Sequence, residues 1–269
     1  MSRQKCKFPK LFVTDLDGTA LGGFNPYSRF PDVYSEFLDK LERHGCKWAT
    51  NTAWDAKPQI DLILGSSIKS MPAFISGVVS LELCILKGDK LENVQPYTDI
   101  MREMLEKVRE SCLNPFIKDI CSKFDPKFLQ YNGAWFEFAP SEELADELFA
   151  YVEENYADRT QLMIQLIREE KMLIALPAFI TKDVVVREIS KLMGIAPEDI
   201  VVAGDQEMDL PMMKPDVAKY FICPDNACQP VKKWVTENGG VVGSRDYGPG
   251  TIEAFGRLAK INGWDWDAL

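Results

Sequence analysis

The amino-acid sequence predicts an α/β protein, in which helices cover both faces of a parallel sheet and a smaller α+β module is inserted. Two observations predict the sheet. Short apolar segments alternate with helical patterns, and each apolar segment runs directly into polar residues. A third observation predicts the insertion, because the middle of the chain places its helices and strand-like segments in a different order.

The first part of the chain alternates strand and helix. Apolar residues recur at helical spacing between Pro31 and Arg43, where Pro31 suits the first turn and Gly45 suits the exit. The expected elements, in order, are a strand over 10–14, a helix over 31–43, a strand over 46–49, a helix over 55–64 and a strand over 73–76. This alternation is typical of a parallel sheet.

The last part of the chain repeats the pattern. We expect a helix over 183–193, which Thr181 can cap and Gly194 can close, strands over 200–203 and 219–223, and a helix over 229–237. Ligands of open parallel sheets bind at the carboxyl ends of the strands. Three of the predicted strands deliver Asp15, Thr50 and Asp205 to that edge.

The middle of the chain predicts the inserted module. Helical patterns cover 97–111 and 141–154, and strand-like segments cover 131–138, 161–167 and 171–176. We therefore expect a core domain of residues 1–86 and 178–269 and an insertion of residues 87–177, with edges at Lys87-Gly88-Asp89 and at Pro177. The aromatic residues of the insertion could line a pocket, although a half-buried strand explains them more simply: Tyr131, Trp135, Phe136 and Phe138.

Composition and charge exclude several classes of function. The formal net charge of −10 disfavours broad contact with nucleic acid or an anionic membrane. No apolar run is long enough to span a membrane, and the one after the basic start is too short for a signal peptide. The seven cysteines form no C-x-x-C pair, which favours reduced thiols in a cytoplasm. The only histidine, His44, sits at a predicted helix end, so chemistry is sought among the carboxylates.

The run Asp15-Leu16-Asp17-Gly18-Thr19 follows the first predicted strand. Two carboxylates this close repel each other, so they need a cation or a shared proton. Asp15 could attack phosphorus and form an aspartyl-phosphate, while Asp17 protonates the leaving oxygen and later deprotonates water. Mg²⁺ would offset the charge. Taken alone, the pattern fits an ordinary turn or helix cap equally well.

Three further features follow predicted strands or open a predicted helix. Asp205 and Asp209 offer oxygen ligands for a hard cation such as Mg²⁺, or a helix cap. Thr50 offers a hydroxyl to a phosphate oxygen, or a cap. Lys182 opens a helix, where the dipole disfavours a cation, so its ammonium is better explained by carboxylates or a phosphate nearby; a surface position is the simpler alternative.

In this order, the four features resemble those of the haloacid dehalogenase (HAD) superfamily of phosphatases, within the Cof-type and sucrose-phosphatase-like group that carries a large α+β cap of the C2 type. The resemblance covers essentially the whole chain and implies a Rossmann-like core with the cap inserted between the second and third motifs. Asp15 to Thr19 resembles the first motif, Thr50 the second, Lys182 the third, and Gly204-Asp205 through Asp209 the fourth.

The resemblance implies roles for these residues. Asp15 is similar to the nucleophile and Asp17 to the acid and base. Thr50, Asn51 and Lys182 would contact the phosphate. Mg²⁺ would be bound by the Asp15 side chain, the Asp17 carbonyl and Asp205, with Asp209 in support. The expected substrate is a small phosphorylated metabolite, a sugar phosphate foremost, and the expected state is a monomer or a weak homo-oligomer.

Three positions depart from the usual motifs. Asn51-Thr52 stands where Gly-Arg is common, Asp183 where the lysine is usually followed by glycine, and Met208 where many relatives have asparagine. None of these changes removes a primary catalytic group, but each bears on substrate contacts or metal affinity. Two alternatives stay open: a phosphomutase similar to phosphomannomutase, and a non-catalytic protein that binds a phosphorylated sugar.

Overall fold

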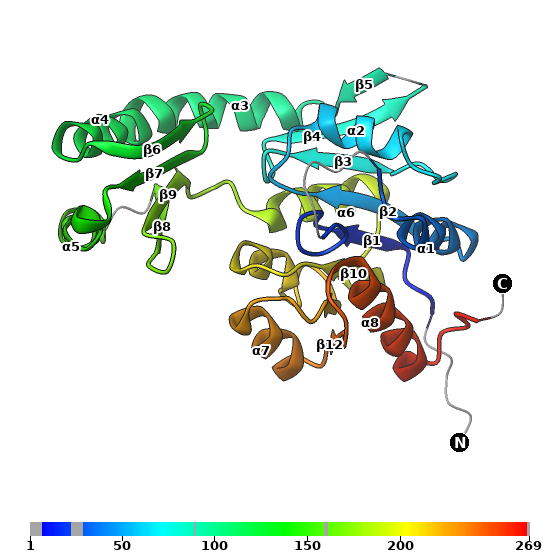
Figure 1. The fold of residues 1–269 in the computed structure, drawn as a ribbon. Helices are drawn as coiled ribbons and strands as arrows, with labels where there is room; N and C mark the ends of the chain where they lie inside the picture. Colours follow the sequence, from blue (N-terminus) through cyan, green and yellow to red (C-terminus); the bar gives the residue numbers. More distant parts are fainter. Residues whose placement is uncertain (1–6, 23–28, 89, 159–160, 268–269) are drawn as a thin grey trace. The chain divides into compact units, whose positions relative to one another are not determined.

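The computed structural model describes residues 7–22, 29–88, 90–158 and 161–267. Contacts divide the chain into two compact units (Figure 1). Unit 1 comprises residues 1–98 and 181–269, and unit 2 comprises residues 99–180. The predicted fold class is confirmed, because a parallel sheet with helices forms the larger unit and an α+β module forms the smaller.

Unit 1 is built on an eight-stranded sheet with the order β12-β11-β10-β1-β2-β3-β4-β5. The strands from β12 to β3 run parallel, and β4 and β5 extend the sheet as an antiparallel hairpin. The strands are β1 (Leu11–Thr14), β2 (Lys47–Asn51), β3 (Phe74–Gly77), β4 (Glu82–Lys87), β5 (Lys90–Asn93), β10 (Ile200–Ala203), β11 (Tyr220–Cys223) and β12 (Val241–Val242).

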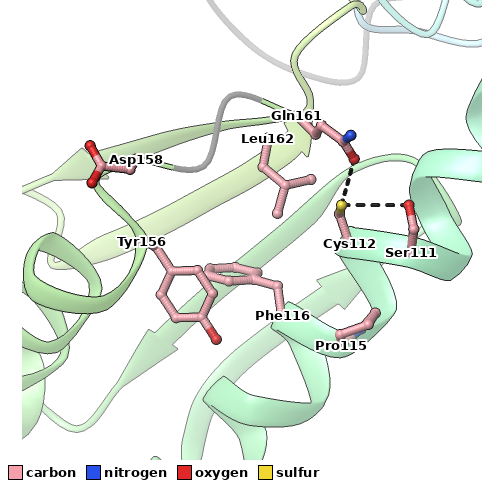
Figure 2. A pocket seen from close by; sticks show the side chains of 8 residues that line it. All are labelled: Ser111, Cys112, Pro115, Phe116, Tyr156, Asp158, Gln161 and Leu162. Atoms are coloured by element: carbon pink, nitrogen blue, oxygen red, sulfur yellow. Dashed lines mark hydrogen bonds between the residues drawn. The ribbon is translucent and has the colours of Figure 1, made fainter.

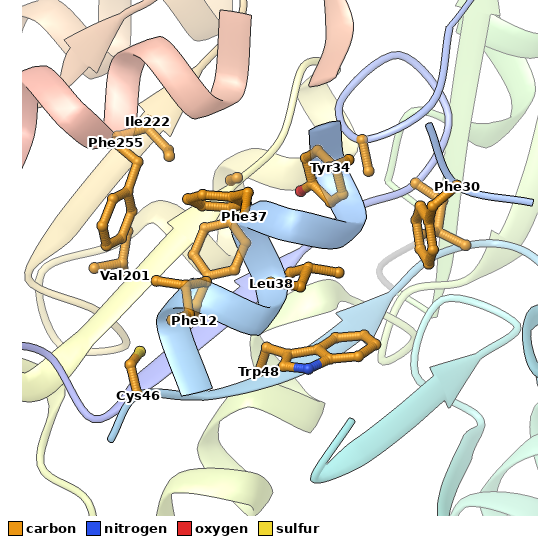
Figure 3. Close-up of a cluster of buried hydrophobic side chains, with 14 of the residues drawn as sticks. Phe12, Phe30, Tyr34, Phe37, Leu38, Cys46, Trp48, Val201, Ile222 and Phe255 are labelled. Atoms are coloured by element: carbon orange, nitrogen blue, oxygen red, sulfur yellow. The ribbon is translucent and has the colours of Figure 1, made fainter. Parts of the chain in front are cut away.

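Helices pack on this sheet through apolar side chains. In Figure 3, Phe37 and Leu38 of α1 meet Phe12 of β1, Trp48 of β2 and Phe255 of α8. Because neighbouring residues of a strand point to opposite faces, Leu11 and Val13 do not belong to this cluster and lie on the other side of the sheet. The helical segments are α1 (Asp32–Arg43), α2 (Ala56–Leu64), α6 (Lys182–Met193), α7 (Gln229–Glu237) and α8 (Tyr247–Asn262), with 3₁₀ turns η3 (Pro197–Asp199) and η4 (Glu207–Met213).

Unit 2 has its own sheet and its own core. Its four antiparallel strands follow the order β6-β7-β9-β8, and its core includes Phe116, Phe136, Phe138 and Phe149. The elements are α3 (Tyr97–Val108), which leads into the unit, a π-helical turn η1 (Arg109–Leu113), α4 (Asn114–Lys123), β6 (Pro126–Tyr131), β7 (Phe136–Pro140), a 3₁₀ turn η2 (Glu142–Leu144), α5 (Ala145–Tyr156), β8 (Leu162–Ile167) and β9 (Met172–Pro177).

The structure corrects two details of the middle region. The predicted strand over 131–138 is wrong, because a turn with Gly133 at φ +91° separates β6 from β7, and the Asn132 side chain accepts the N–H of Trp135. The predicted edge at 87–89 falls inside the β4–β5 hairpin of the main sheet, and Asp89 lies outside the described residues. The structural division lies instead at 98/99 and 180/181.

Two expectations from composition can be compared with the described residues. Within these ranges, no helix combines the length and apolar character needed to cross a bilayer. Six cysteines are free thiols, at positions 46, 84, 112, 121, 223 and 228, whereas Cys6 and the rest of the segment 1–6 lie outside the described ranges.

Candidate active site

Asp15 stands at the carboxyl end of a central strand. β1 pairs with β10 on one side and β2 on the other, and the Asp15 N–H continues the ladder by donating to the Ala203 carbonyl at 3.0 Å. The side chain is buried. The chain then folds back, because the Leu16 carbonyl accepts the N–H groups of residues 19, 20 and 21. A buried strand followed by a tight turn thus fixes the position of this carboxylate.

Asp17 lies on the same turn but is exposed. Gly18, at φ +76°, adopts a backbone conformation that residues with a side chain rarely take. The Asp17 carboxylate accepts a hydrogen bond from the Trp54 indole, with Nε1 at 2.5 Å from Oδ2. The two aspartates of the first motif therefore have different surroundings: Asp15 is buried, and Asp17 is open to an incoming molecule.

Lys182, the residue of the third motif, contacts the carboxylates of the first and fourth motifs. It is the first residue of α6 and is buried, with its Nζ 3.0 Å from Asp15 Oδ1 and 2.5 Å from Asp209 Oδ1. Burial on its own would lower the pKa of Lys182, but the two carboxylates reverse this and leave the pKa above its ordinary value. The ammonium is therefore charged, and it offsets part of the negative charge around it.

Asp209 organises the turn that carries Asp205. Its Oδ2 accepts the N–H groups of Asp205 and Gln206, at 2.8 and 2.9 Å. A Cβ on Gly204 would lie 2.3 Å from Asp209 Cγ, so only glycine allows this close approach. Asp205 in turn accepts a hydrogen bond from Thr19, with Oγ1 at 2.7 Å from Oδ1. The first and fourth motifs are thus linked directly.

Asp15, Asp205 and Asp209 form a buried acidic cluster, in which one oxygen of each carboxylate lies within 4.8 Å of the others. Burial raises the pKa of Asp15 to about 8, Lys182 opposes the rise, and the other two carboxylates add to it. Burial, and to a smaller extent the negative charge of Asp209, raises the pKa of Asp205 to about 6. Three carboxylates and one ammonium leave two negative charges uncompensated when all are ionised, and oxygen donors of this kind suit a hard divalent cation.

Thr50 and Asn51 end β2 beside this cluster. The Thr50 hydroxyl donates to Gln59 Oε1 at 2.5 Å, and the Gln59 amide donates onward to the Ser76 carbonyl. Asn51 Nδ2 donates to the Lys182 carbonyl at 2.8 Å. Of the two residues predicted to contact phosphate, Asn51 is therefore hydrogen-bonded to the start of α6, and Thr50 is hydrogen-bonded to Gln59.

A family model of haloacid dehalogenase-like hydrolases matches residues 103–243, which is more than half of the chain. The chain belongs to this family. It is accordingly an enzyme of the HAD hydrolase type. A comparison with curated protein sequences finds no match.

Solved structures share the fold of this HAD hydrolase. The sucrose-phosphatase of Synechocystis sp., solved with sucrose and phosphate, has a TM-score of 0.62 and 16% identity, covering 93% of this chain and 98% of that one. A haloacid dehalogenase-like hydrolase of Bacillus subtilis has a TM-score of 0.60 and 15% identity, with 96% and 94% covered. A HAD superfamily phosphatase of Bacteroides thetaiotaomicron has a TM-score of 0.60 and 15% identity, with 98% of both covered.

Several residues of this HAD hydrolase support the site without having been predicted from the sequence. Trp54 contacts Asp17, and Thr19 contacts Asp205. Asn226 donates to the Gly18 carbonyl at 2.8 Å and accepts the N–H of Tyr247, so it ties the turn to the start of α8. Thr19 lies within the first motif and was open to prediction. Trp54 and Asn226 belong to no motif and reach the turn only through the tertiary fold.

Two other features are separate from the carboxylate cluster. His44 follows α1 and stacks against Phe8 and Trp266, in agreement with a structural role. Unit 2 holds a cavity of about 310 Å³, in which Phe116, Tyr156 and Leu162 form an apolar wall (Figure 2). None of the residues that line this cavity is a predicted catalytic residue.

Proposed function

We propose that the protein is a Mg²⁺-dependent phosphatase of small phosphate monoesters, sugar phosphates foremost, which forms an aspartyl-phosphate on Asp15. The observation that carries the proposal is the buried cluster of Asp15, Asp205 and Asp209 with Lys182 between two of them. The sucrose and phosphate named for the Synechocystis structure support the substrate class. Unit 2 is proposed to be the cap of such an enzyme.

The acidic cluster fits the metal that the HAD family implies. The Asp15 carboxylate, the Asp17 carbonyl and Asp205 would hold Mg²⁺, and Asp209 would support them by fixing the turn of Asp205. When bound, the ion would supply the positive charge that the two uncompensated carboxylates and a phosphate dianion require. Burial is the main cause of the raised pKa values of Asp15 and Asp205, and the neighbouring carboxylates add to it.

The protein's own residues then divide the reaction. A carboxylate oxygen of Asp15 attacks phosphorus as the bond from phosphorus to the leaving oxygen breaks, and Asp17 gives its proton to that oxygen. Asp17 next takes a proton from water, which attacks the aspartyl-phosphate and releases inorganic phosphate. Lys182 stays charged beside Asp15 and offsets charge that builds up on the phosphoryl oxygens.

The test is phosphate release from a panel of phosphorylated sugars and an aryl phosphate, with Mg²⁺ and with chelator, for the wild type and Asp15→Asn. We expect release that needs Mg²⁺ and falls by more than about 10³-fold in Asp15→Asn, because the amide keeps the shape but is not a nucleophile. Release that persists in the variant would refute the mechanism. Transfer of the phosphoryl group to a second sugar position would indicate a mutase, and binding without release would indicate a binding protein.

A further inference from the structure

We propose that Trp54 is a positioning residue for Asp17, acting through the hydrogen bond from its indole N–H. The inference rests on the proposed function, since it assigns Trp54 a part in the proton transfers of that reaction. Trp54 belongs to none of the four motifs. It is half-buried and packs against the core cluster of unit 1, while Asp17 is exposed. A fixed ring therefore holds a carboxylate that would otherwise be free to change rotamer.

The contact divides the two oxygens of Asp17 between two tasks. Trp54 Nε1 lies 2.5 Å from Oδ2, and an indole N–H can only donate. When Asp17 is protonated, Oδ2 is the acceptor for the indole, so the proton is carried on Oδ1. That oxygen is then the one that gives its proton to the leaving group and later takes one from water. The hydrogen bond thus selects which oxygen of Asp17 takes part in the proton transfers.

The backbone that carries Trp54 is itself held by a strained turn. The N–H of Val78 donates to the Trp54 carbonyl and the N–H of Val79 to the Thr52 carbonyl, both at 2.9 Å. Val78 and Val79 have φ of +48° and +65°, a conformation that is costly for β-branched residues. Gln59 adds a donor, with Nε2 3.2 Å from the Trp54 carbonyl. Strain of this kind persists only where the surrounding structure enforces it, and here the three hydrogen bonds to the Trp54 and Thr52 carbonyls hold the loop that carries the indole.

The proposal predicts a loss that depends on the leaving group. An alkyl phosphate such as a sugar phosphate needs a proton on its departing oxygen, whereas dinitrophenolate departs without one. Trp54→Phe keeps an aromatic ring and removes the N–H. In single-turnover measurements with enzyme in excess, we expect it to slow transfer from a sugar phosphate about 10- to 100-fold, and transfer from dinitrophenyl phosphate less than about 3-fold.

The matched control is Trp234→Phe, which removes another half-buried indole donor, bonded to the Met213 carbonyl, and should change neither rate. In an Asp17→Asn background, Trp54→Phe should have no further effect, because the acid through which it acts is gone. Equal losses on both substrates, or a full additional loss in that background, would overturn the inference while leaving the phosphatase intact. Absence of release from the wild type on both substrates would refute the proposed function and this inference together.

A measurement independent of activity tests the contact itself. In ¹H–¹⁵N spectra, the Trp54 indole signal, assigned by its loss in Trp54→Phe, should shift clearly in Asp17→Ala. The Trp234 indole signal in the same spectrum should stay in place. An unmoved Trp54 signal would show that the hydrogen bond is absent from solution and would overturn the proposal whatever the kinetics.

Discussion

At the level of single residues, the missing side chain of Gly18 allows the turn after Asp15 to approach Asp205. A Cβ on Gly18 would lie 2.1 Å from Asp205 Oδ2, closer than any real contact. The same carboxylate is anchored by Thr19 through its other oxygen, so it has little room to retreat. The position of a proposed metal ligand therefore depends on a residue that contributes no chemistry of its own.

This arrangement predicts a contrast between two glycines. Gly18 and Gly45 have φ of +76° and +77°, but a Cβ on Gly45 meets nothing within 4 Å. Gly45→Ala should cost only the backbone strain, about 1–2 kcal/mol of unfolding free energy, and should keep the stabilisation by Mg²⁺. Gly18→Ala carries the same strain and also displaces Asp205. We expect its melting temperature to rise far less with Mg²⁺, as measured by thermal unfolding over a Mg²⁺ titration. Equal responses of the two variants would contradict the argument.

The site residues differ in how far local sequence predicts them. Asp15, Asp17 and Gly18 follow one buried strand, and Asp205 and Asp209 follow another, so a short pattern of residues carries the prediction. The structure brings Asp15, Asp205, Asp209 and Lys182 together. Trp54 could not be predicted in this way, because its contact with Asp17 depends on how the loop after β2 is folded against the turn after β1. The spacing of residues along the chain does not reveal a contact of this kind.

At the level of elements, strands and helices with buried faces were predictable from the sequence. Elements that form only because they pair with another part of the fold were not. β1, α1, β10 and α7 lie within a residue or so of their predicted ranges. The β4–β5 hairpin has no strong pattern of its own, and it exists because β4 can pair with the edge of β3. α4 was missed as well: Pro115 is tolerated in its first turn, and the π-helical turn η1 joins it to α3 without a break.

One element contact in unit 2 predicts a dependence of stability on pH. Asp119 of α4 accepts hydrogen bonds from Tyr151 and Tyr156 of α5, at 2.6 and 2.7 Å, and pairs with Lys123. Burial raises the pKa of Asp119, but these three partners outweigh it and hold the pKa at about 2. Because the folded state binds this proton less tightly than the unfolded state, the stabilisation is complete above pH 5 and is lost as the pH falls towards 2.

Asp119→Asn should therefore cost about 1 kcal/mol of unfolding free energy at pH 7, allowing for solvent screening at this half-buried site, and much less at pH 2.5. Denaturant unfolding at the two pH values measures the difference. Asp125→Asn makes the same charge change at an exposed position just after α4 and should leave the free energy within about 0.5 kcal/mol of the wild type. A cost for Asp119→Asn that is as large at pH 2.5 as at pH 7 would exclude the ionised carboxylate as its source.

At the level of the whole molecule, the chain leaves unit 1 at residue 98 and returns at residue 181. The two flanking segments supply adjoining halves of one sheet: β1 to β5 come from the first, β10 to β12 come from the second, and the halves meet where β1 pairs with β10. The acidic cluster spans the same division, with Asp15 from the first segment and Asp205 and Asp209 from the second, which also supplies Lys182. Unit 1 therefore forms, with its site, only when both segments are present.

Unit 2 has the features of an independently folding module. Its core residues, from Leu113 to Ala175, all belong to residues 99–180, and its four-stranded sheet is complete within that range. A module with its own core is expected to fold when separated from the rest of the chain. We therefore predict that a fragment of residues 99–180 unfolds cooperatively, as followed by circular dichroism, and that Asp119→Asn destabilises it by as much as it destabilises the full chain.

Because the acidic cluster lies wholly in unit 1, Mg²⁺ should raise the melting temperature of the full chain and leave that of the fragment unchanged. A fragment that shows no cooperative transition would mean that unit 2 depends on unit 1 for its stability, and a fragment stabilised by Mg²⁺ would place a metal site outside the cluster of Asp15, Asp205 and Asp209.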